Sequence, residues 1–84
     1  MISVVIPTLN AGKGLAKTLA ALVPGALDGL VKEVIVSDGG STDQTLALAD
    51  AAGCEIASGP AGRGAQLAAG AALARADWLL FLHA

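Results

Sequence analysis

Short β-branched runs alternate along the chain with longer stretches rich in leucine and alanine. Ser3–Ile6 is an apolar run stopped by Pro7, and Val31–Ser37 contains a second one. Continuous apolar runs of this length, bounded by turn residues, predict strands that are buried on both faces. Weaker runs at Glu55–Ala57 and Trp78–Leu82 predict a third and a fourth strand.

Three helices are predicted between these strands. The first, Lys13–Val23, places its leucines on one face and is expected to end at Pro24. The second is expected to begin at Ser41, the first residue of a capping-box pattern, and to stop at Gly53. The third covers the alanine-rich stretch Arg63–Ala76. The order β-α-β-α-β-α-β predicts an α/β fold, a three-layer Rossmann-like parallel sheet with helices on both faces.

The composition narrows the class of protein. The 84 residues are enough for one small domain, and 55% hydrophobic against 14% charged residues exclude a disordered chain. A net charge of −2 and an aromatic content of 2% argue against a nucleic-acid-binding protein. The single Cys54 fits a reducing, cytoplasmic setting, and no basic leader or membrane-spanning run is present in the sequence.

Polar residues gather where the predicted strands end. In an open parallel sheet, ligands bind beyond the carboxyl ends of the strands, near the point where the strand order reverses. The residues expected there are Pro7, Thr8, Asn10, Ser37, Asp38, Ser41, Arg63 and His83. This pattern predicts a crevice that binds a small polar ligand.

Two charged residues are the main candidates, and each has a structural alternative. Asp38 could accept hydrogen bonds from a ribose or a base, beside Gly39 and Gly40 that would let a ligand approach the backbone. Asp38 could equally cap its own turn. Arg63 begins a helix, where a cation opposes the helix dipole, and a bound diphosphate would offset that conflict. A solvated surface arginine is the alternative.

The familiar nucleotide and catalytic motifs are absent from the sequence. No phosphate-binding G-x-x-x-x-G-K-[ST], dinucleotide G-x-G-x-x-G, nucleophile elbow or metal-spaced Cys/His cluster is found. Trp78 is expected to anchor the core and Lys13 to lie on a solvated helix face. Composition and spacing alone therefore indicate a nucleotide-type binding half-domain.

Four segments resemble the opening of the inverting family 2 glycosyltransferases. They are I-S-V-V-I-P-T-L-N, V-I-V-S-D-G-G-S-T-D, G-R-G-A-Q-L-A-A-G-A-A and W-L-L-F-L-H-A, which begin at residues 2, 34, 62 and 78. Their order and spacing match the family over essentially the whole chain. The D-G-G-S variant, together with G-R-x-x-Q and F-L-H-A, is most similar to a bacterial subgroup sometimes linked to arsenosugar biosynthesis. The resemblance implies the N-terminal half of a GT-A fold.

The resemblance also implies roles for particular residues in binding a nucleotide-diphosphate sugar. The family segment that matches Pro7, Thr8 and Leu9 lines the nucleoside pocket. The position of Asp38 belongs to a carboxylate pair that recognises the base and the ribose, and Arg63 matches a basic residue near the nucleotide.

The chain departs from the family pattern in ways that affect these expectations. Gly39 takes the place of the second acid of the pair, and Ala11 and Ala69 replace a frequent Glu and Asn. The family binds a divalent cation, Mn or Mg, through an Asp that would follow Ala84. We therefore expect residues 1–84 to be a partial donor-binding domain, truncated before the metal-binding Asp and the catalytic base, and inactive in transfer by itself.

Two other classes of function compete with this interpretation. A non-catalytic nucleotide-binding or interaction module is the first, because a fourth strand at the sheet edge could drive self-association. A dinucleotide-binding fold is the second, and it is disfavoured because the first turn lacks the glycine fingerprint.

Overall fold

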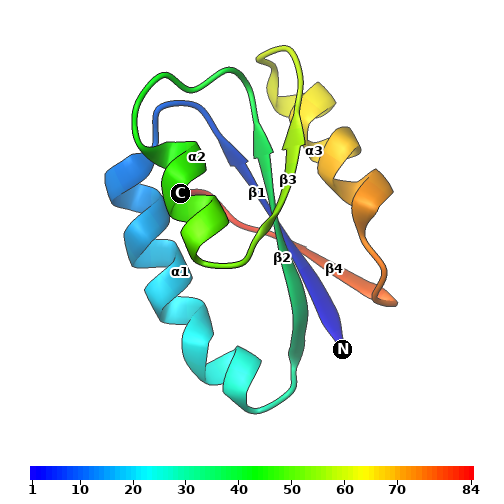
Figure 1. The fold of residues 1–84 in the computed structure, drawn as a ribbon. Helices are drawn as coiled ribbons and strands as arrows, with labels where there is room; N and C mark the ends of the chain where they lie inside the picture. The colour runs from blue at the N-terminus through cyan, green and yellow to red at the C-terminus, as the bar shows by residue number, and fades with distance from the viewer.

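The computed structural model describes all of residues 1–84 and contains seven elements. These are β1 (Ile2–Thr8), α1 (Gly12–Leu27), β2 (Val31–Asp38), α2 (Thr45–Ala51), β3 (Glu55–Ser58), α3 (Arg63–Leu73) and β4 (Trp78–Phe81). The strands form one parallel sheet in the order β3-β2-β1-β4 (Figure 1). The predicted α/β order and parallel sheet are confirmed.

Helices cover both faces of the sheet. Helices α1 and α2 lie together on one face, and α3 packs across β1 and β2 on the other (Figure 1). Val4, Ile6 and Val36 point toward α1 and α2, where they pack with Leu15 and Ala49 in a fully buried cluster. This cluster forms the core because successive strand side chains point to opposite faces, and every second residue of β1 meets the same helices.

The strand order places the carboxyl ends of β1 and β4 side by side. The chain moves outward from β1 to β2 and β3 and then returns across the sheet to pair β4 with β1. The connections through α1 and α2 cross one face of the sheet, and the connection through α3 crosses the other face. This change of face opens a crevice between the carboxyl ends of β1 and β4. The predicted site residues lie at this edge of the sheet.

Helix α1 continues beyond Pro24, where the sequence predicted its end. Proline removes the hydrogen bond to the carbonyl of Ala20, but Ala20 is exposed, so water can satisfy that oxygen. The helix ends one turn later at Leu27. Gly29 then adopts a φ of 79° and its N–H donates to the carbonyl of Ala26 at 3.1 Å, as in a Schellman ending.

Helix α2 begins at Thr45 and not at Ser41. The Ser41 hydroxyl donates to Asp38 Oδ1 at 2.5 Å and accepts from the Asn10 N–H at 2.8 Å, so it is not a helix cap. The carboxylate of Asp43 accepts from the Thr45 N–H at 2.9 Å instead. The capping-box prediction was wrong because its serine belongs to a contact between two loops.

Helix α3 ends at Leu73, three residues before the predicted end, because the backbone amides of Arg75 and Ala76 bind outside the helix. The N–H of Arg75 donates to Glu33 Oε2 at 2.6 Å, and the N–H of Ala76 donates to the Ser3 hydroxyl at 3.1 Å. Ser3 in turn donates to Glu33 at 2.7 Å. These bonds fasten the α3–β4 connection to the amino ends of β1 and β2.

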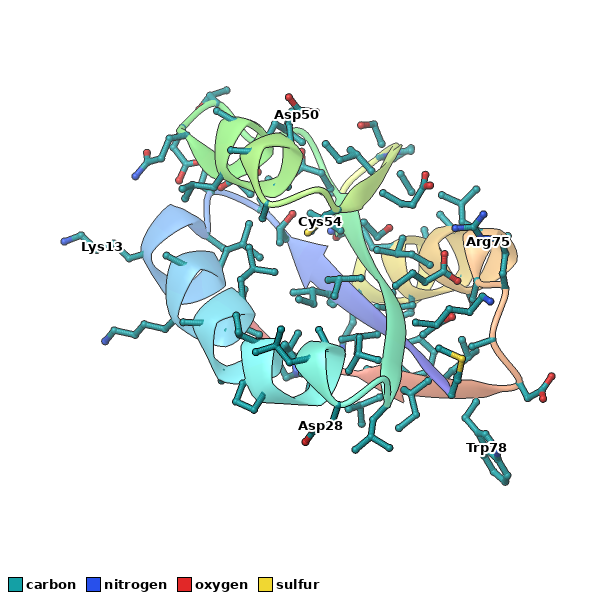
Figure 2. All side chains as sticks on the ribbon, turned by 60° about the horizontal axis from the view of Figure 1, so that its bottom comes forward. Lys13, Asp28, Asp50, Cys54, Arg75 and Trp78 are labelled. Atoms are coloured by element: carbon teal, nitrogen blue, oxygen red, sulfur yellow. The ribbon has the colours of Figure 1, made fainter.

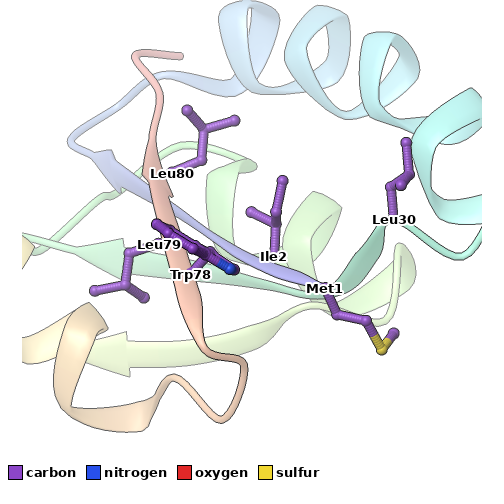
Figure 3. Close-up of a pocket in the computed structure, with 6 residues that line it drawn as sticks. All are labelled: Met1, Ile2, Leu30, Trp78, Leu79 and Leu80. Carbon is purple, nitrogen blue, oxygen red and sulfur yellow. The ribbon is translucent and has the colours of Figure 1, made fainter.

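Strand β4 has one hydrogen-bonded neighbour and little cover on its faces. Its residues, Trp78 to Phe81, are 42–70% exposed, and Trp78 points away from the sheet (Figure 2). The expectation that Trp78 anchors the core was wrong, because no helix packs over this edge. An all-hydrophobic hollow of about 430 Å³ lies beside it (Figure 3). It is lined by Met1, Ile2, Leu30, Trp78, Leu79 and Leu80.

None of the three helices combines the length and the hydropathy that a membrane span would need.

Candidate nucleotide site

The loops that follow β1 and β2 are joined by hydrogen bonds. Asn10 Oδ1 accepts from the backbone N–H groups of Thr42 at 2.7 Å and Asp43 at 3.2 Å. In return, Asp43 Oδ2 accepts from the N–H of Gly12 at 3.2 Å. Asn10 takes a left-handed φ of 49°, a conformation that asparagine tolerates better than most residues. We call this set of contacts the loop seam, and it holds the two strand ends in one fixed arrangement.

Asp38, the last residue of β2, lies 1% exposed beneath these loops. Its carboxylate accepts from the Thr8 hydroxyl at 2.7 Å, the Ser41 hydroxyl at 2.5 Å, and the N–H groups of Ser41 at 2.8 Å and Gly40 at 3.0 Å. Burial raises the pKa of Asp38, but these hydrogen bonds outweigh burial and hold the pKa below its usual value. The ionised carboxylate therefore organises the turn from within.

Gly39 and Gly40 differ in their surroundings. A Cβ at Gly39 would lie 3.0 Å from the Cα of Ala61 and 3.1 Å from Gln66 Oε1, so the loop after β3 fills the space beside this glycine. Gly40 has a φ of 103° and open space around its α-carbon. A ligand can therefore approach the backbone closely at Gly40. At Gly39, the absence of a side chain lets two loops pack together.

A shallow pocket of about 210 Å³ opens at the carboxyl ends of β1 and β4. Its lining is mostly polar and consists of Pro7, Thr8, Leu9, Arg63, Gln66 and His83. A smaller hollow of about 60 Å³ shares Pro7, Arg63 and His83 with it. Four of the eight residues predicted at the strand ends thus line one pocket, and Leu9, which the family resemblance added, lines it too. Asp38 reaches the pocket through its hydrogen bond to Thr8.

Arg63 and His83 meet at the rim of this pocket. The guanidinium Nη2 of Arg63 lies 2.6 Å from Nε2 of His83. Because arginine only donates, Nε2 is the acceptor and the ring proton resides on Nδ1. No carboxylate lies within 4 Å of the guanidinium, since the one ion pair of the chain joins Arg75 and Glu33. The cation thus stands at the start of α3 without an anionic partner.

Gln66 is a site residue to which sequence reasoning gave no role. It is 8% exposed and its Nε2 donates to the carbonyls of Thr8 and Ser37, each at 2.9 Å. Its Oε1 accepts from the N–H of Gly62 at 3.1 Å. The available signal was an isolated glutamine on an alanine-rich helix, three residues after Arg63 and so on a neighbouring part of the helix surface.

Residues 1–84 contain no group of three or more His, Cys, Asp or Glu side chains that could hold a metal ion. Arg63 and the N-terminus of α3 bring positive charge to the pocket.

A parallel α/β sheet with a polar pocket at its switch point defines a class of proteins that bind small, often phosphorylated, ligands. Within this class the assignment is specific. The profile of the family described as Glycosyl transferase family 2 matches residues 3–84, and the chain belongs to that family. The resemblance noted in the sequence is confirmed.

Relatives of known activity share a large part of the chain. Glucosyl-3-phosphoglycerate synthase of Mycolicibacterium smegmatis is 44% identical over 57 residues, which is 68% of this chain and 18% of that protein. The synthase of Mycobacterium tuberculosis is equally similar, with 17% of its length covered. The chain thus matches less than a fifth of the length of these curated relatives.

Solved structures confirm the GT-A type of fold. A Mycobacterium tuberculosis glucosyl-3-phosphoglycerate synthase complexed with Mn²⁺, UDP and glucosyl-3-phosphoglycerate superposes with a TM-score of 0.84 at 35% identity. The match covers 99% of this chain and 33% of that one. A complex of the same synthase with Mg²⁺ and UDP gives a TM-score of 0.84, with 99% and 32% coverage. The solved relatives therefore contain the divalent cations and nucleotide that the resemblance implied, whereas the arsenosugar-linked subgroup stays a prediction.

Proposed function

We propose that the pocket at the carboxyl ends of β1 and β4 binds the nucleoside diphosphate of a nucleotide-sugar donor. In this proposal residues 1–84 are the donor-binding part of a glycosyltransferase that passes the sugar to an acceptor still to be identified. The observation that carries the proposal is the placement of Arg63, whose guanidinium borders the pocket without a carboxylate partner. A diphosphate would supply the missing negative charge.

The lining divides into parts that suit different portions of such a donor. Arg63 and the N-terminus of α3 suit the diphosphate, since backbone N–H groups at a helix start attract anions. Leu9 is 51% exposed beside Thr8 and offers an apolar surface to the nucleobase. UDP is the first nucleotide to test because the solved relatives are UDP complexes.

The acidic residues near the pocket suit binding better than proton transfer. Hydrogen bonds from Thr45, with a smaller contribution from Gly12, lower the pKa of Asp43, and the bonds from Ser41, Thr8 and Gly40 outweigh burial and lower the pKa of Asp38. Neither is arranged as a general base, which needs a pKa nearer to neutrality. We therefore propose that residues 1–84 bind the donor without transferring its sugar.

The test is an NMR titration of the 84-residue chain with UDP and with uridine. In the native chain we expect UDP to bind more tightly than uridine, because only UDP carries the diphosphate. Arg63→Ala should reduce UDP affinity about tenfold or more, as loss of a charge-assisted contact implies. It should leave uridine affinity nearly unchanged.

Arg75→Ala is the matched control, since it removes the same charge from the far end of α3. Its ratio of UDP to uridine affinity should equal that of the native chain. Absence of UDP binding in the native chain, or equal ratios for Arg63→Ala and Arg75→Ala, would contradict the proposed site.

A further inference from the structure

Gln66 connects three segments that are distant in the sequence. Its amide nitrogen bridges the carbonyls of Thr8 and Ser37, and its amide oxygen holds the N–H of Gly62. The backbone adds to this connection, because the Ser37 hydroxyl donates to the carbonyl of Gln66 at 2.5 Å. We propose that Gln66 is the positioning residue of the nucleotide pocket, which sets the separation of β1 and β2 and the placement of Arg63; this rests on the proposed function.

The link to Arg63 passes through Gly62. Gln66 and Gly62 form a reciprocal pair, because the N–H of Gln66 also donates to the carbonyl of Gly62 at 2.8 Å. Gly62 has a φ of 153°, a conformation that residues with a Cβ rarely adopt, and Arg63 follows it directly. Anchoring Gly62 therefore fixes where α3 begins and where the arginine side chain leaves the backbone.

The link to the strand ends is equally specific. The carbonyl of Thr8 accepts from the N–H of Gly39 as well as from Gln66, each at 2.9 Å. Thr8 lines the pocket and its hydroxyl binds Asp38. The side chain of Gln66 thus contacts the backbone of the residue that joins the pocket to the buried carboxylate.

These contacts require both kinds of hydrogen-bonding group on one side chain. The primary amide provides two donors for the two carbonyls and an acceptor for the N–H. Methionine has the same length and fills the same space but makes none of these bonds. A glutamate supplies the acceptor, yet in its ionised form it brings negative charge against two carbonyl oxygens.

The experiment measures UDP affinity of the 84-residue chain in Gln66→Met and Gln66→Glu, under conditions where circular dichroism shows each variant folded. Gln66→Met should bind UDP about tenfold more weakly, the loss expected when buried groups lose their hydrogen bonds. Ser3→Ala is the control, because it removes a buried hydrogen-bonded hydroxyl at the opposite end of the sheet. Ser3→Ala should lower stability and leave UDP affinity unchanged.

A pH profile separates positioning from general loss of stability. Burial and the two carbonyls raise the pKa of a glutamate at position 66, and its protonated form can donate one of the lost bonds. The affinity of Gln66→Glu relative to the native chain should therefore rise as the pH falls from 8 to 5. Arg63, His83 and Asp38 are the other ionisable groups that border this end of α3, and both proteins contain them. Dividing the UDP affinity of Gln66→Glu by that of the native chain at each pH therefore cancels their contribution.

The result that overturns the proposal is UDP affinity of Gln66→Met within twofold of the native chain. If the native chain itself fails to bind UDP, the proposed function is wrong. The role of Gln66 in positioning Gly62 is then tested in the absence of ligand. Amide hydrogen exchange at Gly62 should then be at least tenfold faster in Gln66→Met than in the native chain or in Ser3→Ala. Equal exchange rates would overturn the role of Gln66.

Discussion

Strand β2 carries a buried carboxylate near each of its ends, and the two are satisfied differently. At the amino edge of the sheet, the Glu33 side chain is 5% exposed and binds the Ser3 hydroxyl, the backbone N–H of Arg75 and its guanidinium at 3.2 Å. At the carboxyl edge, Asp38 is bound by hydroxyls and backbone amides alone. Each carboxylate is stabilised as an anion, but only Glu33 takes up a cation.

The difference shows how a small domain can pair opposite charges at one edge of a sheet and leave a cation unpaired at the other. At the amino edge, acid and base neutralise one another, so this end has little to offer an ionic ligand. At the carboxyl edge, neutral donors stabilise Asp38, and Arg63 has no carboxylate partner. Protein dipoles that satisfy an anion without a counter-ion allow a neighbouring cation to act independently.

Asp38→Ala should show the largest effect and tests whether neutral donors really support the carboxyl edge. The change leaves the buried hydroxyl of Thr8 and three partly buried donors, the Ser41 hydroxyl and the N–H groups of Gly40 and Ser41, without their acceptor. We expect unfolding free energy to fall by about 3 kcal/mol, measured by urea denaturation. Asp38→Asn, which keeps one acceptor oxygen, should lose less, and equal stability of Asp38→Ala and the native chain would refute the account.

Acidification should have the next largest effect, because it lowers the stability that the carboxylates at both edges provide. The folded-state pKa values of Glu33 and Asp38 lie below their ordinary values of 4.5 and 3.8, so both groups stabilise the fold while ionised. For Glu33 the main cause is the hydrogen bond from Ser3, and the contacts with Arg75 add to it. Because both pKa values are depressed by folding, the contribution is full above about pH 5 and is lost as the pH falls through the folded values.

Thermal unfolding followed from pH 7 to pH 2 measures this loss. Asp38→Asn and Glu33→Gln should each be less stable than the native chain at pH 7 and should show a smaller decrease in acid. A native-sized decrease in both variants would assign acid sensitivity to other groups.

The exposed edge strand β4 predicts self-association, which the sequence also suggested. Strand β4 presents unpaired backbone groups and exposed apolar side chains, a combination that favours edge-to-edge pairing. Analytical ultracentrifugation should show a larger mean mass as concentration rises. Trp78→Lys should reduce this dependence, whereas Leu27→Lys, at an 81% exposed position on α1, should not. A monomer at every concentration would contradict the prediction.

Arg75→Ala should have the smallest effect. The Arg75 side chain is 66% exposed, so its ion pair with Glu33 is screened by water, and its loss should cost about 0.5 kcal/mol. The backbone N–H of Arg75 would still bind Glu33. A loss of several kcal/mol in urea denaturation would mean that the guanidinium, and not the backbone, holds the amino edge.

The sequence was informative wherever local pattern and packing agree. Apolar runs located all four strands, and the alternation of elements predicted the parallel sheet. The predicted end of α1 and the predicted start of α2 were wrong because the local pattern does not show the surroundings of a residue: Ser41 binds another loop, and Pro24 is tolerated on an exposed helix face. Trp78 was misplaced because hydrophobicity alone does not reveal that a strand lacks a covering helix.

Some residues of the candidate site could likewise be predicted from the sequence, and others could not. Residues that follow strands, such as Thr8 and Asp38, could be predicted because parallel strands bring their carboxyl ends together. The role of Gln66 could not, because it depends on a helix from another part of the chain meeting two strand ends. Distances across a fold are not encoded in local spacing.

The loop seam has a consequence for how this sequence can vary. Asn10 accepts hydrogen bonds from residues some thirty positions away, and Asp43 accepts one from the N–H of Gly12, so each loop fixes the shape of the other. A substitution that is harmful in one loop can be tolerated when the other loop changes to match, so effects at these positions should not add. Mutational drift at the carboxyl edge should therefore proceed by paired replacements, and a library that randomises one loop alone will sample mostly variants in which the two loops no longer fit together.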